Sequence, residues 1–438
     1  MSVAERSMGF GLRTLGRIAG SDLVDRLGVR GPAEKAIYRA TRDGFRAVSA
    51  SGRTFKKVQR KGQPVRLKSA GESGLFDLTP TDEQQMIQES FRAFATEQLR
   101  PAANAADAAR AAPRELIEQV AELGLSMLGV PEELGGAVSE RSTLTSVLAS
   151  EALAYGDMGL AVAALAPASV ASALSMWGDG DQQATYLPAL VGDDIPSAAL
   201  ALQEPRALFD PRKLETVARA DGADYVLSGV KALVPLAAEA SLLIVGARIE
   251  GKGPALFLLE TSTSGVLSKA APTMGVRAAG TGDVLLEDVR VPTSALLGGG
   301  DPDVYAECIR RARLAWCALS LGTAQAVLDY VIPYVNDRTA FGEPISHRQA
   351  VAFAISDIAI ELEGMRLATL RAASRADAGK EFAAEVAYAR TLCAEKGAQI
   401  GSHGVQLLGG HGYVTEHPVE RWYRDLQAVG VFEGALLV

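Results

Sequence analysis

The spacing of apolar residues changes twice along the 438-residue chain, and this change limits the fold more than any other feature. From Phe76 to about Asp194, apolar residues recur at the helical spacing of three and four positions. Between Ile195 and Pro292, short runs such as SLLIVGARI and ALFLLE, separated by Gly, Asp and Ser, are typical of strands. Long helical patterns return after Asp301. This order predicts a small β domain inserted between two helical domains.

We therefore predict an α+β fold divided into several domains, because a chain of this length exceeds one ordinary core. A basic N-terminal extension with amphipathic helices precedes a helical domain, a small β-barrel or sandwich domain and a C-terminal four-helix bundle. The predicted boundaries of these parts are residues 1–75, 76–194, 195–300 and 301–438.

Positive charge is concentrated in the first 70 residues, which hold 16 Lys and Arg but 5 Asp and Glu, although the net charge of the whole chain is −8. Two roles for this extension stay open: peripheral contact with a membrane surface or an anionic partner, and packing on its own protein. Its aromatic residues do not alternate with the basic ones as in stacking platforms, so we expect no nucleic-acid partner. We also expect no apolar run of the roughly 18 to 20 residues that span a bilayer.

The cysteines and histidines predict neither a disulfide framework nor a metal site. Cys308, Cys317 and Cys393 are odd in number and lack CxxC spacing, which favours a reduced, intracellular compartment. The four histidines lack the HExxH or paired-carboxylate context of a metal site. No GxGxxG motif stands between a strand and a helix, so a Rossmann site is set aside. We predict a cytoplasmic protein, with membrane association of the extension left open.

One glutamate near the end of the chain is the first candidate for chemistry. Glu433 follows the glycine-rich and charged segment QLLGGHGYVTEHPVERWYRD and is set among Val429, Val431, Phe432 and Leu436. An ionised carboxylate costs free energy among apolar side chains, and such a group is suited to taking and returning protons. The alternative is a buried carboxylate that takes part in no reaction.

Three motifs in this order make the chain from Phe76 to Val438 resemble the acyl-CoA dehydrogenase family. DRTAFGEPISHRQA resembles the family's R-x-x-F-G…Q segment, and QLLGGHGYVTEHPVERWYRD its Q-x-x-G-G-x-G…R-D segment. FEG resembles the tripeptide that holds the catalytic base. The resemblance implies the family's helical, β and helical domains. It also implies an FAD enzyme that makes a double bond between the α and β carbons of an acyl-CoA thioester.

The resemblance assigns roles to individual residues. It implies that Glu433 takes the α-proton while flavin N5 takes the hydride, and that backbone N–H groups polarise the thioester carbonyl. It implies that Arg313, Gly434 and Asp210 bind substrate. The residues implied to bind FAD are Arg338, Phe341, Gln349, Gln406, Gly409, Gly410 and Gln203.

For some of these residues, the neighbouring residues in the sequence also allow a purely structural role. Arg338 has Asp337 and Glu343 near it in the sequence, which is enough for a surface ion pair. Gly409 and Gly410 follow a helical pattern, which is enough for a helix-ending turn.

The middle segment departs from the family pattern where the family's residues meet the flavin ring. Gln203 stands in place of a Thr or Ser, and Leu233 and Pro235 stand in place of a Trp and a Thr. The run RALFDP replaces a glycine-rich loop and keeps only Asp210.

The end of the chain also departs from the family pattern. Ala435 replaces a threonine, and the sequence ends before the helix into which the family continues, so we expect less cover against water.

The leading interpretation is an FAD-dependent acyl-CoA dehydrogenase of fatty acid metabolism. It would pass electrons to an electron-transfer flavoprotein and assemble as a homodimer or homotetramer. An acyl-CoA oxidase shares the proton and hydride steps and stays open. The interpretation from another class is a non-catalytic or partner subunit of the family, which the departures of the middle segment favour and Glu433 and Arg338 oppose.

Overall fold

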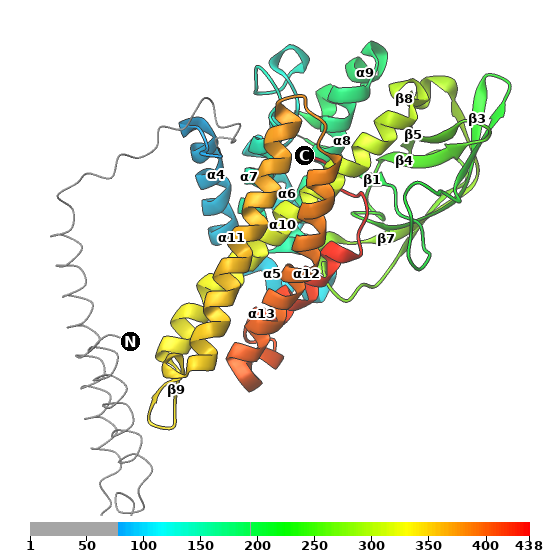
Figure 1. Ribbon diagram of the computed structural model, residues 1–438. Helices are drawn as coiled ribbons and strands as arrows, with labels where there is room; N and C mark the ends of the chain where they lie inside the picture. The colour runs from blue at the N-terminus through cyan, green and yellow to red at the C-terminus, as the bar shows by residue number, and fades with distance from the viewer. Residues whose placement is uncertain (1–77, 193) are drawn as a thin grey trace, which may run out of the picture. The chain divides into compact units, whose positions relative to one another are not determined.

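Helices form the first described part of the chain (Figure 1). The computed structural model describes residues 78–192 and 194–438, so the extension predicted for residues 1–75 and its membrane contact lie outside it. Thr81 and Gln84 begin α4 with reciprocal bonds from side chain to backbone. The helices are α4 (Asp82–Phe94), a π-helical turn (Ala95–Leu99), α5 (Arg100–Ala109), α6 (Arg114–Glu122), α7 (Thr143–Gly156), α8 (Met158–Trp177) and α9 (Gly180–Leu190).

The middle part of the described chain is one eight-stranded sheet, as the change to strand spacing predicts. Neighbouring strands follow the order β6-β7-β3-β2-β4-β5-β8, and β1 pairs in parallel with β4, so that Ala198 lies opposite Leu242. The strands are β1 (Ala198–Ala201), β2 (Val217–Asp221), β3 (Asp224–Val234), β4 (Leu242–Ile249), β5 (Gly253–Glu260), β6 (Val266–Ala270), β7 (Gly282–Pro292) and β8 (Leu296–Leu297).

The last part is helical again, which confirms the predicted fold class. The long helix α10 (Pro302–Asp337) packs against α7, α11 and α12 and also touches β5, while α8 lies against β1. These contacts join the helices and the sheet into one compact unit of residues 76–438. The remaining elements are β9 (Thr339–Ala340), β10 (Glu343–Pro344), α11 (Gln349–Asp377), α12 (Ala383–Leu408) and α13 (Val419–Leu426).

Helix α8 corrects the expectation that no apolar run reaches membrane-spanning length. Its 20 residues include no charged side chain. Both α8 and α10 are long and apolar enough to span a membrane by length and composition. In α8, 94% of the most apolar 18-residue window is buried inside the protein, and in α10 the corresponding share is 72%. The run is easy to overlook because Ala, Ser and Gly make up much of it. Burial places both helices in the core of this protein.

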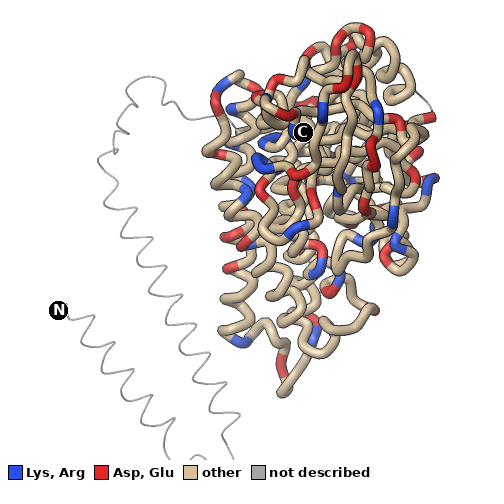
Figure 2. Tube along the Cα trace, turned by 90° about the vertical axis from the view of Figure 1, so that its right-hand side faces the viewer, with Lys and Arg blue, Asp and Glu red and all other residues tan. Residues whose placement is uncertain are grey.

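A cluster of buried ionisable side chains joins three distant parts of the chain. Lys, Arg, Asp and Glu are interspersed along the described chain (Figure 2), but Arg421, Asp425 and Asp157 are buried together. Arg421 on α13 donates to Asp157, the N-cap of α8, over 2.9 Å. Asp425 accepts a bond of 2.6 Å from the amide of Val276, in the loop before β7. Burial, and then the nearby Asp157, raises the pKa of Asp425 to about 8.

The raised pKa of Asp425 gives a first testable consequence for stability. Between its ordinary value of 3.8 and about 8, the folded chain binds a proton here that the unfolded chain has lost. The free energy of unfolding should therefore fall as pH rises through this window, by up to about 1.4 kcal/mol per pH unit. We expect Asp425→Asn to flatten this dependence, measured as thermal unfolding from pH 5 to 8. Asp329→Asn, at an exposed position, is the matched control. An unchanged slope in Asp425→Asn would contradict this expectation.

Candidate functional site

Glu433 lies where α10 and α12 meet the end of β1, and two arginines bind its carboxylate. Arg313 of α10 bonds both oxygens, with Nε 2.8 Å from Oε2 and Nη2 3.0 Å from Oε1. Arg390 of α12 lies 3.1 Å from Oε1. The glutamate side chain is only 12% exposed, but it faces charge rather than the apolar surroundings that the local sequence indicates. Such charge-assisted hydrogen bonds are stronger than bonds between neutral groups, so they fix the position of the carboxylate.

The backbone around Glu433 is held at consecutive residues. Trp316 of α10 donates its indole N–H to the carbonyl of Gly434 over 2.8 Å, and Arg390 donates to the carbonyl of Phe432 over 2.7 Å. Gly434 has a φ of +76°, and a Cβ added there would lie 2.7 Å from the Leu202 side chain. Glycine is therefore needed at this position both for its backbone conformation and for space. The residues that follow it, up to the last, are buried.

Gln203 bonds to the segment that carries Glu433. Its Oε1 accepts the Glu433 N–H over 2.9 Å, and its Nε2 donates to the carbonyl of Val431 over 3.2 Å. The resemblance implies a flavin contact for this residue, and that role stays a prediction. Leu233, at the end of the neighbouring strand β3, has a φ of +55°, and Pro235 is buried. A branched residue with positive φ is strained, and such strain is often found beside functional sites.

Arg390 is the residue of this cluster that the sequence reading missed. Burial lowers its pKa, and the Glu433 carboxylate opposes that effect. Its Nη1 is buried without a hydrogen-bond partner in the described part of the chain. A signal was available: Arg390 follows Val386 by four positions and precedes Cys393 and Gly397 by three and seven, so it falls on the buried face of α12. A lone cation on such a face indicates an unseen anionic partner.

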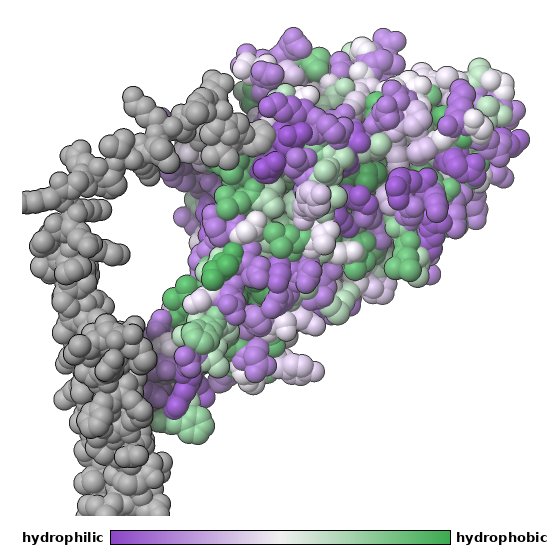
Figure 3. All heavy atoms as spheres, viewed as in Figure 1, coloured by the Kyte–Doolittle hydropathy of each residue, from purple (hydrophilic) through white to green (hydrophobic). Residues whose placement is uncertain are grey.

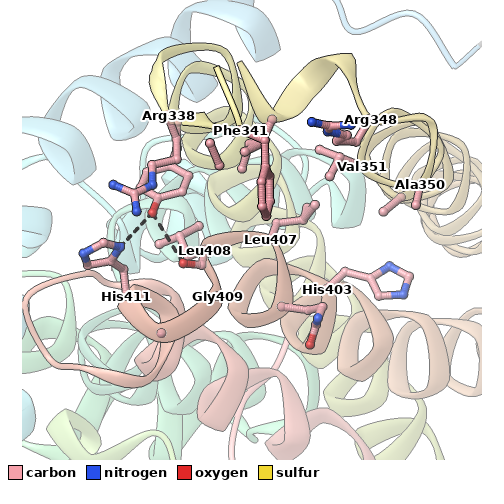
Figure 4. Close-up of a pocket in the computed structure, with 16 residues that line it drawn as sticks. Arg338, Phe341, Arg348, Ala350, Val351, His403, Leu407, Leu408, Gly409 and His411 are labelled. Carbon is pink, nitrogen blue, oxygen red and sulfur yellow. Dashed lines mark hydrogen bonds between the residues drawn. The ribbon is translucent and has the colours of Figure 1, made fainter. Parts of the chain in front are cut away.

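A second group of predicted residues lines a pocket of about 1080 Å³ between the α10 to α11 connection and the end of α12 (Figure 4). Figure 4 shows Phe341 pointing into this pocket, with Arg338 and Arg348 on the same side and His411 opposite. Tyr334 bonds His411 at 3.0 Å across the end of the pocket. The predicted residues that line it are Arg338, Phe341, Gln406, Gly409 and Gly410.

The chemistry of this pocket suits the adenosine and diphosphate parts of a dinucleotide. In the described part of the chain no carboxylate pairs with Arg338, while Arg348 pairs with Glu343 at 3.1 Å. One guanidinium group can bind two phosphate oxygens at once. The exposed ring of Phe341 offers a face on which a nucleobase can stack. Gly409 combines φ +58° with ψ −133°, which requires glycine and leaves the backbone open to a ligand.

Two of the predicted site residues lie outside both groups. Gln349 is the exposed first residue of α11, and its neighbours Arg348 and Ala350 line the pocket instead. Asp210 lies in the loop between β1 and β2, where its carboxylate bonds to the backbone and side chain of Arg212. Hydrogen bonds from Arg212 lower the pKa of Asp210.

Comparison with known proteins identifies the family. Three family models match successive parts of the chain: acyl-CoA dehydrogenase N-terminal domain at residues 81–194, middle domain at 199–289 and C-terminal domain at 303–436. The mitochondrial short-chain specific acyl-CoA dehydrogenase of Bos taurus is 34% identical over 357 residues, which is 80% of this chain and 86% of that protein.

Solved structures agree with the family models. Butyryl-CoA dehydrogenase from Megasphaera elsdenii has a TM-score of 0.76 at 29% identity, covering 82% of this chain and 96% of that one. A structure described as PigA with FAD and proline has a TM-score of 0.76 at 26% identity, covering 82% and 95%. Fold and matches together define an oxidoreductase with a sheet between two helical domains. The chain belongs to the acyl-CoA dehydrogenase family, as its motifs predict.

Gly434 provides a test of how tightly the Glu433 segment is held. We expect Gly434→Ala to lower the free energy of unfolding by about 1 to 3 kcal/mol, because the added Cβ meets Leu202 and the positive φ disfavours alanine. Gly430→Ala is the control, since a Cβ there has its nearest neighbour at 3.6 Å, and it should change stability by less than about 0.5 kcal/mol. Denaturant unfolding measures the free energy of unfolding of both variants. A loss of stability in Gly434→Ala as small as that in Gly430→Ala would show that the segment is loosely packed.

Proposed function

We propose that this protein is an FAD-dependent acyl-CoA dehydrogenase, which oxidises a thioester between its α and β carbons. The observation that carries the proposal is the placement of Glu433, whose carboxylate is held by Arg313 of α10 and Arg390 of α12. A base must be held in one orientation to meet a C–H bond. The FEG motif and the family match support the same residue.

In the proposed reaction, Glu433 takes the α-proton. Arg313 and Arg390 bind its carboxylate oxygens and hold the group in place. The side chain of Arg313 is 30% exposed and that of Arg390 is 12% exposed. Arg313 is therefore the partner that has room to turn away when an acyl group enters, while Arg390 keeps the carboxylate oriented.

The pocket at the end of α12 is the proposed site for the adenosine and diphosphate parts of FAD. Arg338 and Arg348 would hold the diphosphate, Phe341 would contact the adenine, and the turn at Gly409 and Gly410 would let the backbone approach. FAD, when bound, supplies the acceptor for the hydride that leaves the β-carbon. An electron-transfer flavoprotein is the proposed acceptor of these electrons, with oxygen as the alternative.

A second candidate function, a non-catalytic subunit of the family, is favoured by one observation. Both the amide and the carboxylate of Glu433 are already bound within the protein, so a substrate would have to displace one of their partners. The strained Leu233 and the buried Pro235 also leave fewer polar groups at the end of β3. A chain that kept only the shape of the family would tolerate such a closed arrangement.

We also propose that a second copy of this chain covers α11. Phe353, Ile360 and Leu367 recur every seven residues on this helix and are 58%, 69% and 48% exposed. Figure 3 shows hydrophobic residues along the face where α11 runs in Figure 1. Val351 and Ala354, from the first turns of the same helix, line the proposed FAD pocket, so a second copy would also border that pocket. Such a stripe is typical of helix pairing between subunits.

The visible absorption spectrum of the purified protein tests the proposed function. We expect flavin bands that bleach when a matching acyl-CoA is added without oxygen, from a panel of straight and branched thioesters. Glu433→Gln should keep the flavin bands and lower the rate of bleaching by about 10²- to 10⁴-fold, because it keeps the volume and removes the base. A protein that binds no FAD would support the non-catalytic subunit, and normal bleaching by Glu433→Gln would remove the glutamate from the mechanism.

Light scattering coupled to gel filtration tests the assembly. We expect the wild-type protein to run as a dimer or tetramer and Ile360→Glu to run as a smaller species, because a buried unpaired charge is costly at such an interface. Leu267→Glu on β6 is the matched control, since Leu267 is also exposed at 55% but lies away from α11. A wild-type monomer, or an Ile360→Glu variant of unchanged mass, would refute an interface on this helix.

A further inference from the structure

We infer that His411 is a further residue that binds the diphosphate of FAD, and that this histidine takes up a proton when FAD binds. The inference rests on the proposed function, because it assigns His411 a task toward the proposed cofactor. His411 lines the same pocket as Arg338. Figure 4 shows these two side chains at the same end of the pocket, one on each wall. An anion that lies between them can therefore meet both.

The charges of the pocket leave room for a further cation. Each phosphate of the FAD diphosphate carries one negative charge. The described residues that line the pocket include no acidic side chain, and no carboxylate of the described chain pairs with Arg338. Arg348 already shares its charge with Glu343 over 3.1 Å. The pocket thus offers a single unshared guanidinium to two phosphates, and a protonated histidine would complete the balance of charge.

The hydroxyl of Tyr334 decides which nitrogen of His411 carries a proton. The Tyr334 oxygen lies 3.4 Å from the carbonyl oxygen of Leu408 and 3.0 Å from Nδ1 of His411. A carbonyl only accepts, so the single hydroxyl proton goes to Leu408 when both bonds form. Nδ1 must then carry a proton of its own and donate to the Tyr334 oxygen. In a neutral ring this leaves Nε2 without a hydrogen.

A bond from Nε2 to a phosphate oxygen therefore requires a second proton on the ring. The described groups that face this ring are Tyr334, Arg338 and His417. The His417 ring centroid lies 5.6 Å away, and Tyr330 bonds its Nδ1 over 2.7 Å. Arg338 repels a cationic ring, whereas a diphosphate between them attracts both cations. The diphosphate and the proton thus favour each other's binding, because such linkage is reciprocal.

The dissociation constant of FAD tests the inference, measured on the full-length protein from the fluorescence of released flavin at pH 6, 7 and 8. Both phosphates keep their charge over this range, so a change reports the protein. We expect Kd to rise by about tenfold from pH 6 to pH 8, because histidine changes its charge in this range. Calorimetry in two buffers of different ionisation enthalpy should show a proton taken up with FAD.

His411→Gln should remove the pH dependence, because glutamine keeps a neutral N–H donor that does not titrate in this range. Its Kd should stay near the wild-type value at pH 8, and no proton should be taken up with FAD. His411 is exposed, so the thermal unfolding of this variant should match the wild type. His403→Gln is the matched control and should keep the wild-type pH dependence. His403 also lines the pocket, but Figure 4 shows it away from Arg338.

Tyr334→Phe tests the role of the hydroxyl. Without the hydroxyl, Nδ1 is free to accept, and a neutral His411 ring can carry its proton on Nε2. FAD should then bind to this variant with little dependence on pH, although His411 is still present. A Tyr334→Phe variant that keeps the full pH dependence of the wild type would contradict the inference.

The outcomes separate this inference from the proposed function. Equal FAD affinity of the wild-type protein at all three pH values, or a full pH dependence in His411→Gln, would overturn the role of His411. Either result would leave the proposed function standing where the bound flavin still bleaches with acyl-CoA. A protein that binds no FAD would overturn the proposed cofactor and this inference with it. Proton uptake that is present in the wild type and lost in His411→Gln would support the inference.

Discussion

The buried ion pair of Arg421 with Asp157, beside the carboxyl group of Asp425, is the constraint on which the placement of the three parts depends. Charges taken out of water are costly unless each has a partner in good geometry. Here the partners come from the start of α8, the loop before β7 and helix α13, so all of these must be in place together. Since Glu433 follows Asp425 by eight residues, the same cluster limits where the candidate base can lie.

The sheet contributes to the site through a second buried pair. Lys231 and Glu204 neutralise each other while bonding the backbone at the end of β1, and this leaves Gln203 facing the final segment of the chain. The helices contribute the guanidinium groups of Arg313 and Arg390. The candidate base is therefore defined from two sides, by a neutral amide that binds its backbone and by cations that bind its side chain.

The sequence predicts the order of helices, strands and helices because periodicity is a local property, and it makes Glu433 a candidate base because motif spacing is local too. It does not predict the partners of Glu433. Arg313 and Arg390 come from helices that only the tertiary fold brings together, and the local neighbours of Glu433 indicate apolar surroundings. The hydrogen bonds of the Gln203 side chain to this segment are hidden for the same reason. The length of α8 can be read from the sequence, but its many small residues make the continuous apolar run easy to miss.

Helix α8 has a consequence for the synthesis of the chain. It carries no charge over 20 residues, and part of its cover comes from α10, which begins at Pro302, long after α8 ends at Trp177. A nascent chain that has just completed α8 therefore exposes an apolar helix whose partner has not yet been made. Such exposed surface promotes aggregation and binds chaperones until the rest of the core arrives. The helix that is buried in the folded core is therefore exposed during translation and needs protection until α10 has been made.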